Sequence, residues 1–281
     1  MNFPFSKIKF QNINYKVEIL AGLTVAMTMI PESLSFAILA GLSPLIGLYG
    51  AVIMGLITAV FGGRPGLISG GAGATVVVLI ALVSSHGVEY LFATLVLAGV
   101  LQFMVGAFKL GKFVRLIPQP VMYGFLNGVA CIIFMSQINQ FKITGTNEWL
   151  SGTALYVMVG LTLLTIAIVY IVPKITKAIP ASLIAILLIF VVTLVFKIDT
   201  KTVADIANIN GSLPSFHIPM VSLSLETLQI IFPYALVMAG VGLIETLLTL
   251  TMVDEITNTK GNSNKEAMAQ GGANILNGFF G

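Results

Sequence analysis

Long apolar runs recur along this chain, and the third of them is interrupted by glycines. The segment 67–75, Leu-Ile-Ser-Gly-Gly-Ala-Gly-Ala-Thr, leads into the apolar run 76–83. That run is too short to cross a bilayer alone, because a membrane-spanning helix needs about 20 residues. Glycines disfavour a stiff helix, so extended chain must supply the remaining length. The pattern predicts a broken span whose half-helix begins in mid-membrane, near Gly73 to Thr75.

The start of this half-helix is a candidate anion site. Irregular backbone at that depth is tolerated only where protein buries it or where it lines a cavity. The N-terminus of a helix offers free N–H groups and a positive dipole end, which favour an anion. The candidate anion-binding residues are Ala72, Gly73, Ala74 and Thr75. The alternative is a kinked helix whose glycines only let neighbouring helices approach.

The composition indicates an integral membrane protein. Of the 281 residues, 57% are hydrophobic and 9% are charged, which is far from the composition of a soluble domain. The sequence has no Walker A lysine loop, no HExxH and no GxSxG, so we expect no enzyme activity and no nucleic-acid partner. Cys131 is the single cysteine, so no metal–thiolate framework and no cofactor other than a coupling ion are expected.

Hydropathy and helix-breaking residues predict eight spans and the beginning of a ninth. Pro173 is expected to end the sixth span, and Asp254 to Glu266 are expected to form a polar loop. The predicted spans cover residues 17–40, 45–61, 67–86, 90–108, 118–137, 153–172, 179–196, 228–253 and 267–281.

The positions of the basic residues agree with this number of spans. With the N-terminus inside, three of the 14 Lys and Arg residues, Lys142, Lys197 and Lys201, fall outside and the other eleven fall inside. This asymmetry is what the positive-inside rule expects of a correct topology. We therefore expect a multi-pass protein of the cell membrane with a cytoplasmic N-terminus.

Two carboxylates lie well inside predicted spans. Glu32 is in the first span and Glu245 is in the eighth, where Thr249 shares its helix face at i+4. A carboxylate with a hydroxyl can ligate sodium or pass on a proton. Glu32 is a candidate substrate-binding residue, although it could instead be a protonated group in a packed interface. The matching positions of Glu32 and Glu245, seven spans apart, suggest an inverted repeat.

Several motifs resemble the sulfate permease (SulP) family of anion transporters. The resemblance lies in Pro31-Glu32, in Ala40-Gly41-Leu42-Ser43-Pro44-Leu45-Ile46-Gly47-Leu48-Tyr49, in 61–69, in 243–249 with 253–255, and in 271–275. It implies an all-α, polytopic transporter fold of seven-plus-seven inverted repeats, with the second repeat truncated here. It also implies that the anion sits at the N-terminus of half-helix 3 and of a tenth span, and that Glu245 and Thr249 bind the coupling ion.

The resemblance also implies a division into a core domain and a gate domain. Because the chain stops before a tenth span and lacks a cytoplasmic STAS domain, we expect it to be a fragment. The expected parts are a cytoplasmic arm (1–16), core spans 1–4 (17–108), gate spans 5–7 (109–200), an extracytoplasmic loop (201–225), and core span 8 with an incomplete span 9 (226–281).

The expected function is secondary active transport of a small inorganic or carboxylate anion, such as sulfate or bicarbonate. It would be coupled to Na⁺ or H⁺, or work by exchange, through movement of the core against the gate. Dimers are common in the family, so a homodimer is one expectation. The alternatives are a nucleobase:cation symporter of the same fold and a non-transporting truncated membrane protein.

Overall fold

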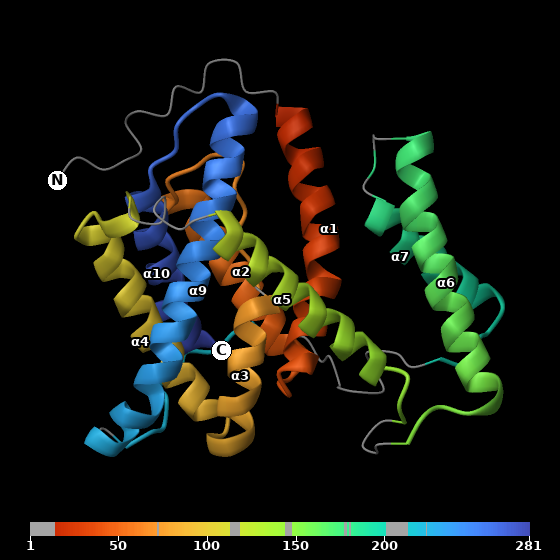
Figure 1. Ribbon diagram of the computed structural model, residues 1–281, viewed down its shortest axis with the longest axis horizontal. Coiled ribbons are helices and arrows are strands. Elements are labelled where there is room, and N and C mark those ends of the chain that lie inside the picture. Colours follow the sequence, from red (N-terminus) through yellow and green to blue (C-terminus); the bar gives the residue numbers. More distant parts are fainter. Residues whose placement is uncertain are drawn as a thin grey trace. The chain divides into compact units, whose positions relative to one another are not determined.

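The computed structural model describes residues 15–71, 73–112, 119–143, 148–176, 179, 181–200, 213–222 and 224–281. These residues form helices, with one isolated β-bridge between Lys142 and Trp149. The helices are α1 (Tyr15–Leu39), α2 (Pro44–Phe61), α3 (Gly73–His86), α4 (Val88–Ala107), α5 (Gln119–Asn139), α6 (Gly152–Ile175), α7 (Ala181–Val195), α9 (Leu225–Thr257) and α10 (Ser263–Phe280) (Figure 1).

The chain divides into two compact units, and the boundary falls inside α1. The first unit comprises Met1–Pro31 and Ser151–Thr200, and the second comprises Glu32–Leu150 and Lys201–Gly281. In the first unit α6 packs against α7. The predicted end of α6 at Pro173 is wrong: the helix continues to Ile175, because the Thr176 N–H still donates to the Val172 carbonyl at 2.9 Å. The predicted core and gate domains stay a prediction.

In the second unit α10 lies against α4, α2 and α9 (Figure 1). Glycines bring α4 and α10 into backbone contact. A Cβ at Gly99 would lie 2.6 Å from the Gly271 carbonyl oxygen, and a Cβ at Gly278 would lie 2.7 Å from the Phe92 carbonyl oxygen. Such close approach through small residues is a common way for helices to pack in membranes.

The polar loop predicted at Asp254 to Glu266 is shorter than expected. α9 continues to Thr257 and ends at Asn258, which adopts a left-handed conformation (φ 50°, ψ 40°). α10 begins at Ser263, because the Asn262 side chain caps it by accepting the Lys265 N–H at 3.1 Å. Only residues between these two caps remain as a loop.

A buried ionic cluster holds this loop against the connection between α2 and α3. Arg64 Nη1 lies 3.1 Å from Asp254 Oδ1, and Arg64 Nη2 donates to the Val253 carbonyl oxygen at 3.1 Å and to Thr257 Oγ1. On the other side, Glu266 Oε2 accepts the Gly63 N–H at 2.6 Å. The start of the broken span is thus fixed to the ends of α9 and α10.

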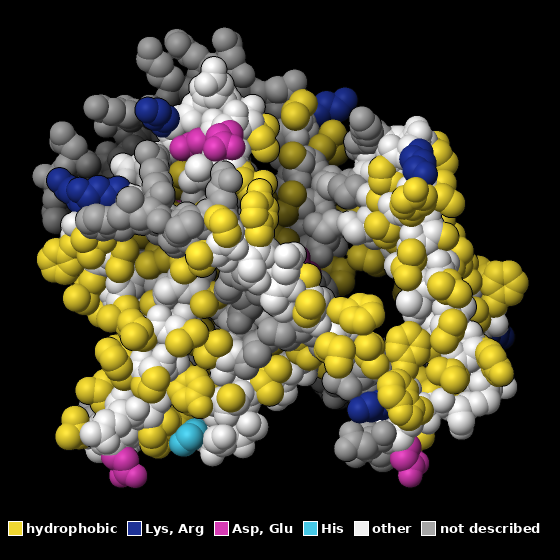
Figure 2. All heavy atoms as spheres, viewed as in Figure 1, with side chains coloured by type: hydrophobic (Ala, Val, Ile, Leu, Met, Phe, Trp, Pro, Cys, Tyr) yellow, Lys and Arg dark blue, Asp and Glu magenta, His cyan; other side chains and the backbone are white. Residues whose placement is uncertain are grey.

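Five helices among the described residues are long and apolar enough to cross a membrane, namely α1, α2, α4, α6 and α9. Apolar side chains dominate the visible face, and charged side chains gather at the ends of the helices (Figure 2). This distribution is what a bilayer requires of the proteins it contains.

Candidate functional site

The third span is broken where the glycines predict. Residues 67–71 are irregular and α3 begins at Gly73, so the alternative of one kinked helix does not hold. Gly73 is buried and Thr75 is partly buried. Ala72 lies outside the described residues, and Ala74 is described only as part of the helix. The N-terminal N–H groups of α3 therefore begin inside the second unit.

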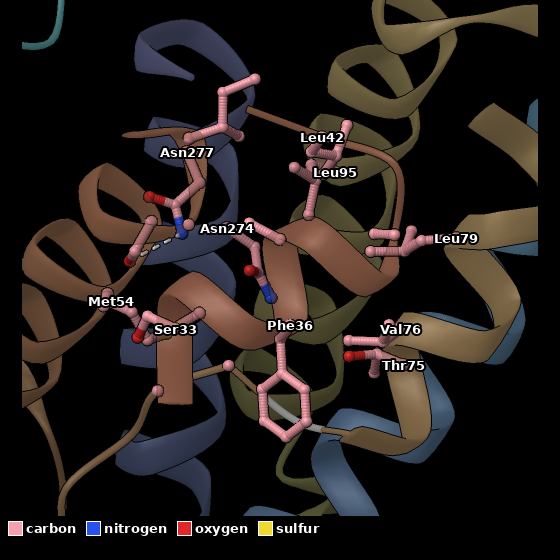
Figure 3. Close-up of a pocket in the computed structure, with 18 of the residues that line it drawn as sticks. Ser33, Phe36, Leu42, Met54, Thr75, Val76, Leu79, Leu95, Asn274 and Asn277 are labelled. Atoms are coloured by element: carbon pink, nitrogen blue, oxygen red, sulfur yellow. Dashed lines mark hydrogen bonds between the residues drawn. The ribbon is translucent and has the colours of Figure 1, made fainter. Parts of the chain in front are cut away.

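A cavity of about 170 Å³ lies beside this helix start. Figure 3 shows Phe36 of α1 and Thr75 of α3 on one side of it and Asn274 and Asn277 of α10 on another. Gly70 and Gly71, in the irregular segment, also line it. The cavity is therefore formed by the broken span, the second half of α1, and α10, with further walls from α2, α4 and α9.

Amide side chains give the cavity a polar wall. Asn274 Nδ2 donates to Gln102 Oε1 at 2.6 Å, and Gln270 Nε2 donates to the Gly242 carbonyl oxygen at 3.3 Å. Asn277 Nδ2 donates to the Gly50 carbonyl oxygen at 3.4 Å (Figure 3). The acceptor oxygens of Gln270 and Asn277 are buried and have no hydrogen-bond partner among the described residues. Buried acceptors of this kind are usually satisfied by water or a ligand.

The two carboxylates predicted from the sequence interact with each other. Glu32 and Glu245 are close enough for electrostatic repulsion. Glu245 Oε2 is buried without a hydrogen-bond partner in the described part of the chain. Thr249 Oγ1 donates to the Glu245 backbone carbonyl at 2.9 Å, which leaves its lone pairs available. A cation or a proton near Glu245 would relieve the repulsion.

The structure brings only some of the predicted site residues to the cavity. Of the predicted anion-binding residues, Thr75 lines the cavity, whereas Gly73 and Glu32 are not among the lining residues. The predicted coupling-ion residues, Glu245 and Thr249, do not line it either. The contributions of Phe36, Gln102 and the amides of α10 to the cavity are not among the predictions. Residues 270, 274 and 277 follow helical spacing, so the pattern could have identified one polar face on α10. The roles of the predicted site residues stay predictions.

Comparison with known proteins finds relatives along almost the whole chain. A family model described as "Sulfate permease family" matches residues 15–281. "Putative sulfate transporter YbaR" of Bacillus subtilis is 44% identical over 268 residues, which are 95% of this chain and 54% of the relative. "Bicarbonate transporter BicA" of Picosynechococcus is 34% identical over 98% of this chain and 52% of its own length. The chain thus spans about half the length of these curated relatives.

Solved structures share the fold. The transmembrane domain of a cyanobacterial bicarbonate transporter, BicA, matches with a TM-score of 0.81 and 30% identity, over 97% of this chain and 74% of that one. Murine Slc26a9, an anion transporter in the inward-facing state, matches with a TM-score of 0.70 and 18% identity, over 93% and 49%. This second likeness concerns the fold alone. Together they confirm the predicted fold class, an all-α polytopic membrane protein of transporter type.

Proposed function

The chain belongs to the sulfate permease family, and from this premise we propose that it serves the secondary transport of a small anion such as sulfate or bicarbonate. The observation that carries the proposal is the position of α3, which begins next to a cavity with polar walls. Transport would proceed by movement of a core domain against a gate domain. The protein would act in the cell membrane with its N-terminus in the cytoplasm, and a homodimer is the proposed assembly.

The anion would be held mainly by backbone. The first N–H groups of a helix have no partner within the helix, and they point toward its N-terminal end. At α3 the first of these groups belong to Gly73 and Ala74, next to the irregular segment. Small side chains there allow a compact anion to approach the N–H groups closely. Glu32, four residues before Phe36 in α1, would influence the affinity for the anion through its charge.

The coupling ion would act at Glu245. Its buried, unpartnered oxygen and the neighbouring Glu32 make a local excess of negative charge. A sodium ion could take the Glu245 carboxylate and the Thr249 hydroxyl as ligands, because hard cations prefer oxygen ligands. A proton on Glu245 would remove the same charge without Thr249.

The test is uptake of radiolabelled sulfate and of radiolabelled bicarbonate into proteoliposomes that contain the 281-residue chain or any longer product of its reading frame. We expect uptake of one of these anions, and we expect Gly73→Leu to abolish it by filling the space at the start of α3. The matched control is Gly55→Leu, because a Cβ at Gly55 meets no described atom within 4 Å.

Each outcome decides the proposal. Loss of uptake in Gly73→Leu with normal uptake in Gly55→Leu supports an anion site at α3. Unchanged uptake in both variants refutes that site. Uptake of a nucleobase in place of an anion would support the symporter alternative, and no uptake by any product would support the non-transporting one.

A further inference from the structure

An apolar groove lies on the second unit, away from the cavity beside α3. Its volume is about 390 Å³, and it runs between α2, α4 and α10. Phe61 and Phe103 form its walls and are 46% and 45% exposed, so its surroundings are apolar and open. An exposed apolar surface of this kind marks a site of contact with lipid or with another apolar surface. The residues that line it are Ile57, Phe61, Phe103, Lys265, Met268, Ala269, Gly272 and Leu276.

The groove follows α10 over a length that suits one lipid chain. From Lys265 to Leu276 the helix advances by eleven residues, or about 16 Å at 1.5 Å per residue. This is close to half of the hydrocarbon core, which is about 30 Å thick. Gly272 lies between these two residues, and a Cβ there would meet no described atom within 4 Å. The absence of a side chain at Gly272 therefore keeps the groove open in its middle.

One end of the groove is basic. Lys265 lies in the first turn of α10 and is the charged residue among those that line the groove. The Gly111 N–H donates to Asn264 Oδ1 at 3.0 Å, which brings the loop with Lys109 and Lys112 to the same end of α10. The neighbouring Glu266 directs its carboxylate to the Gly63 N–H, on the side of the α2–α3 connection.

We propose that this groove binds an anionic phospholipid, with an acyl chain between α2, α4 and α10 and the phosphate at Lys265. The phosphate would lie at the level of the basic loops, which the distribution of Lys and Arg assigns to the inner leaflet. Anionic lipids are attracted to basic residues near that surface by about 1 kcal/mol per residue. The groove supplies apolar contact along the chain, and Lys265 supplies the preference for a negative head group.

The experiment is native mass spectrometry of the detergent-solubilised chain after addition of phosphatidylglycerol or phosphatidylcholine. We expect retention of phosphatidylglycerol to exceed that of phosphatidylcholine. Lys265→Gln should lower phosphatidylglycerol retention about fivefold, the equivalent of one basic contact, and leave phosphatidylcholine unchanged. Lys265→Arg should keep the preference. Gly272→Leu should reduce the retention of both lipids, because its side chain fills the groove.

The control for charge is Lys260→Gln, which removes a lysine outside the groove, and the control for the glycine is Gly272→Ala. Equal retention of the two lipids by the unmodified chain would overturn the proposal. So would an equal loss in Lys260→Gln and Lys265→Gln, because the effect would then be one of general charge. If Lys265→Gln does not fold, Lys265→Arg and Gly272→Leu still test the proposal. Unchanged retention of phosphatidylglycerol by Gly272→Leu would refute lipid binding in the groove.

Discussion

The Arg64 guanidinium lies 3.1 Å from the Asp254 carboxylate, across a junction between segments that are far apart in the sequence. The two side chains are 5% and 11% exposed. Arg64 comes just before the irregular segment that leads to α3, whereas Asp254 is in the last turn of α9. The pair therefore fixes the entry to the half-helix relative to the helix that carries Glu245.

Breaking this pair should destabilise the protein. Arg64→Gln leaves the Asp254 carboxylate buried without its partner, and loss of one member of a buried ion pair costs about 3–5 kcal/mol. We expect a clear fall in melting temperature, measured by fluorescence-detected size-exclusion chromatography after heating. Lys109→Gln removes an exposed lysine and should have little effect. The double variant Arg64→Gln/Asp254→Asn should be more stable than Arg64→Gln; equal or lower stability would show that the pairing is unimportant.

Replacement by alanine should affect the stability of the protein differently at two adjacent glycines of α10, Gly271 and Gly272. A Cβ at Gly271 would lie 2.5 Å from the Phe103 backbone nitrogen, whereas a Cβ at Gly272 meets no described atom within 4 Å. Gly271→Ala should therefore cost about 1–3 kcal/mol through overpacking, and Gly272→Ala should be nearly neutral. The same thermal assay measures both, and similar melting temperatures would contradict the close packing.

The hydrogen bond between Asn274 and Gln102 should appear as a coupling energy. Asn274→Leu leaves Gln102 Oε1 buried without its donor, at a cost of about 1–3 kcal/mol. Replacing both residues by leucine should cost less than the sum of the two single changes. A double-mutant cycle on unfolding in denaturant measures this difference. Strict additivity would mean that the bond contributes nothing.

Substitutions in α9 should separate proton coupling from sodium coupling. Glu245→Gln removes the carboxylate and should abolish gradient-driven uptake with either ion, without loss of folded protein. Thr249→Val removes only a hydroxyl ligand. It should therefore weaken uptake driven by a sodium gradient and spare uptake driven by a proton gradient. Proteoliposomes with imposed gradients provide the measurement, and full uptake by Glu245→Gln would eliminate this residue as the coupling group.

The sequence predicts best where a single segment determines the structure. The start of α3 at Gly73 follows from the glycines and the short run 76–83, and it is confirmed. The continuation of α9 through Asp254 could not be predicted, because the partner that neutralises this carboxylate, Arg64, lies in a distant segment. The buried, unpartnered acceptor oxygens of Gln270 and Asn277 could not be predicted either, because their burial depends on how α2, α4 and α9 pack around α10.

The bond between Gln102 and Asn274 also concerns the order in which the chain is made. The two residues are 172 positions apart. At roughly 5–20 residues per second, the ribosome needs about 9 to 34 s to add that length. During this interval a newly inserted α4 must hold the Gln102 amide in the bilayer without its final partner. α4 is thus a helix that can enter the membrane early but can complete its polar contacts only when α10 arrives.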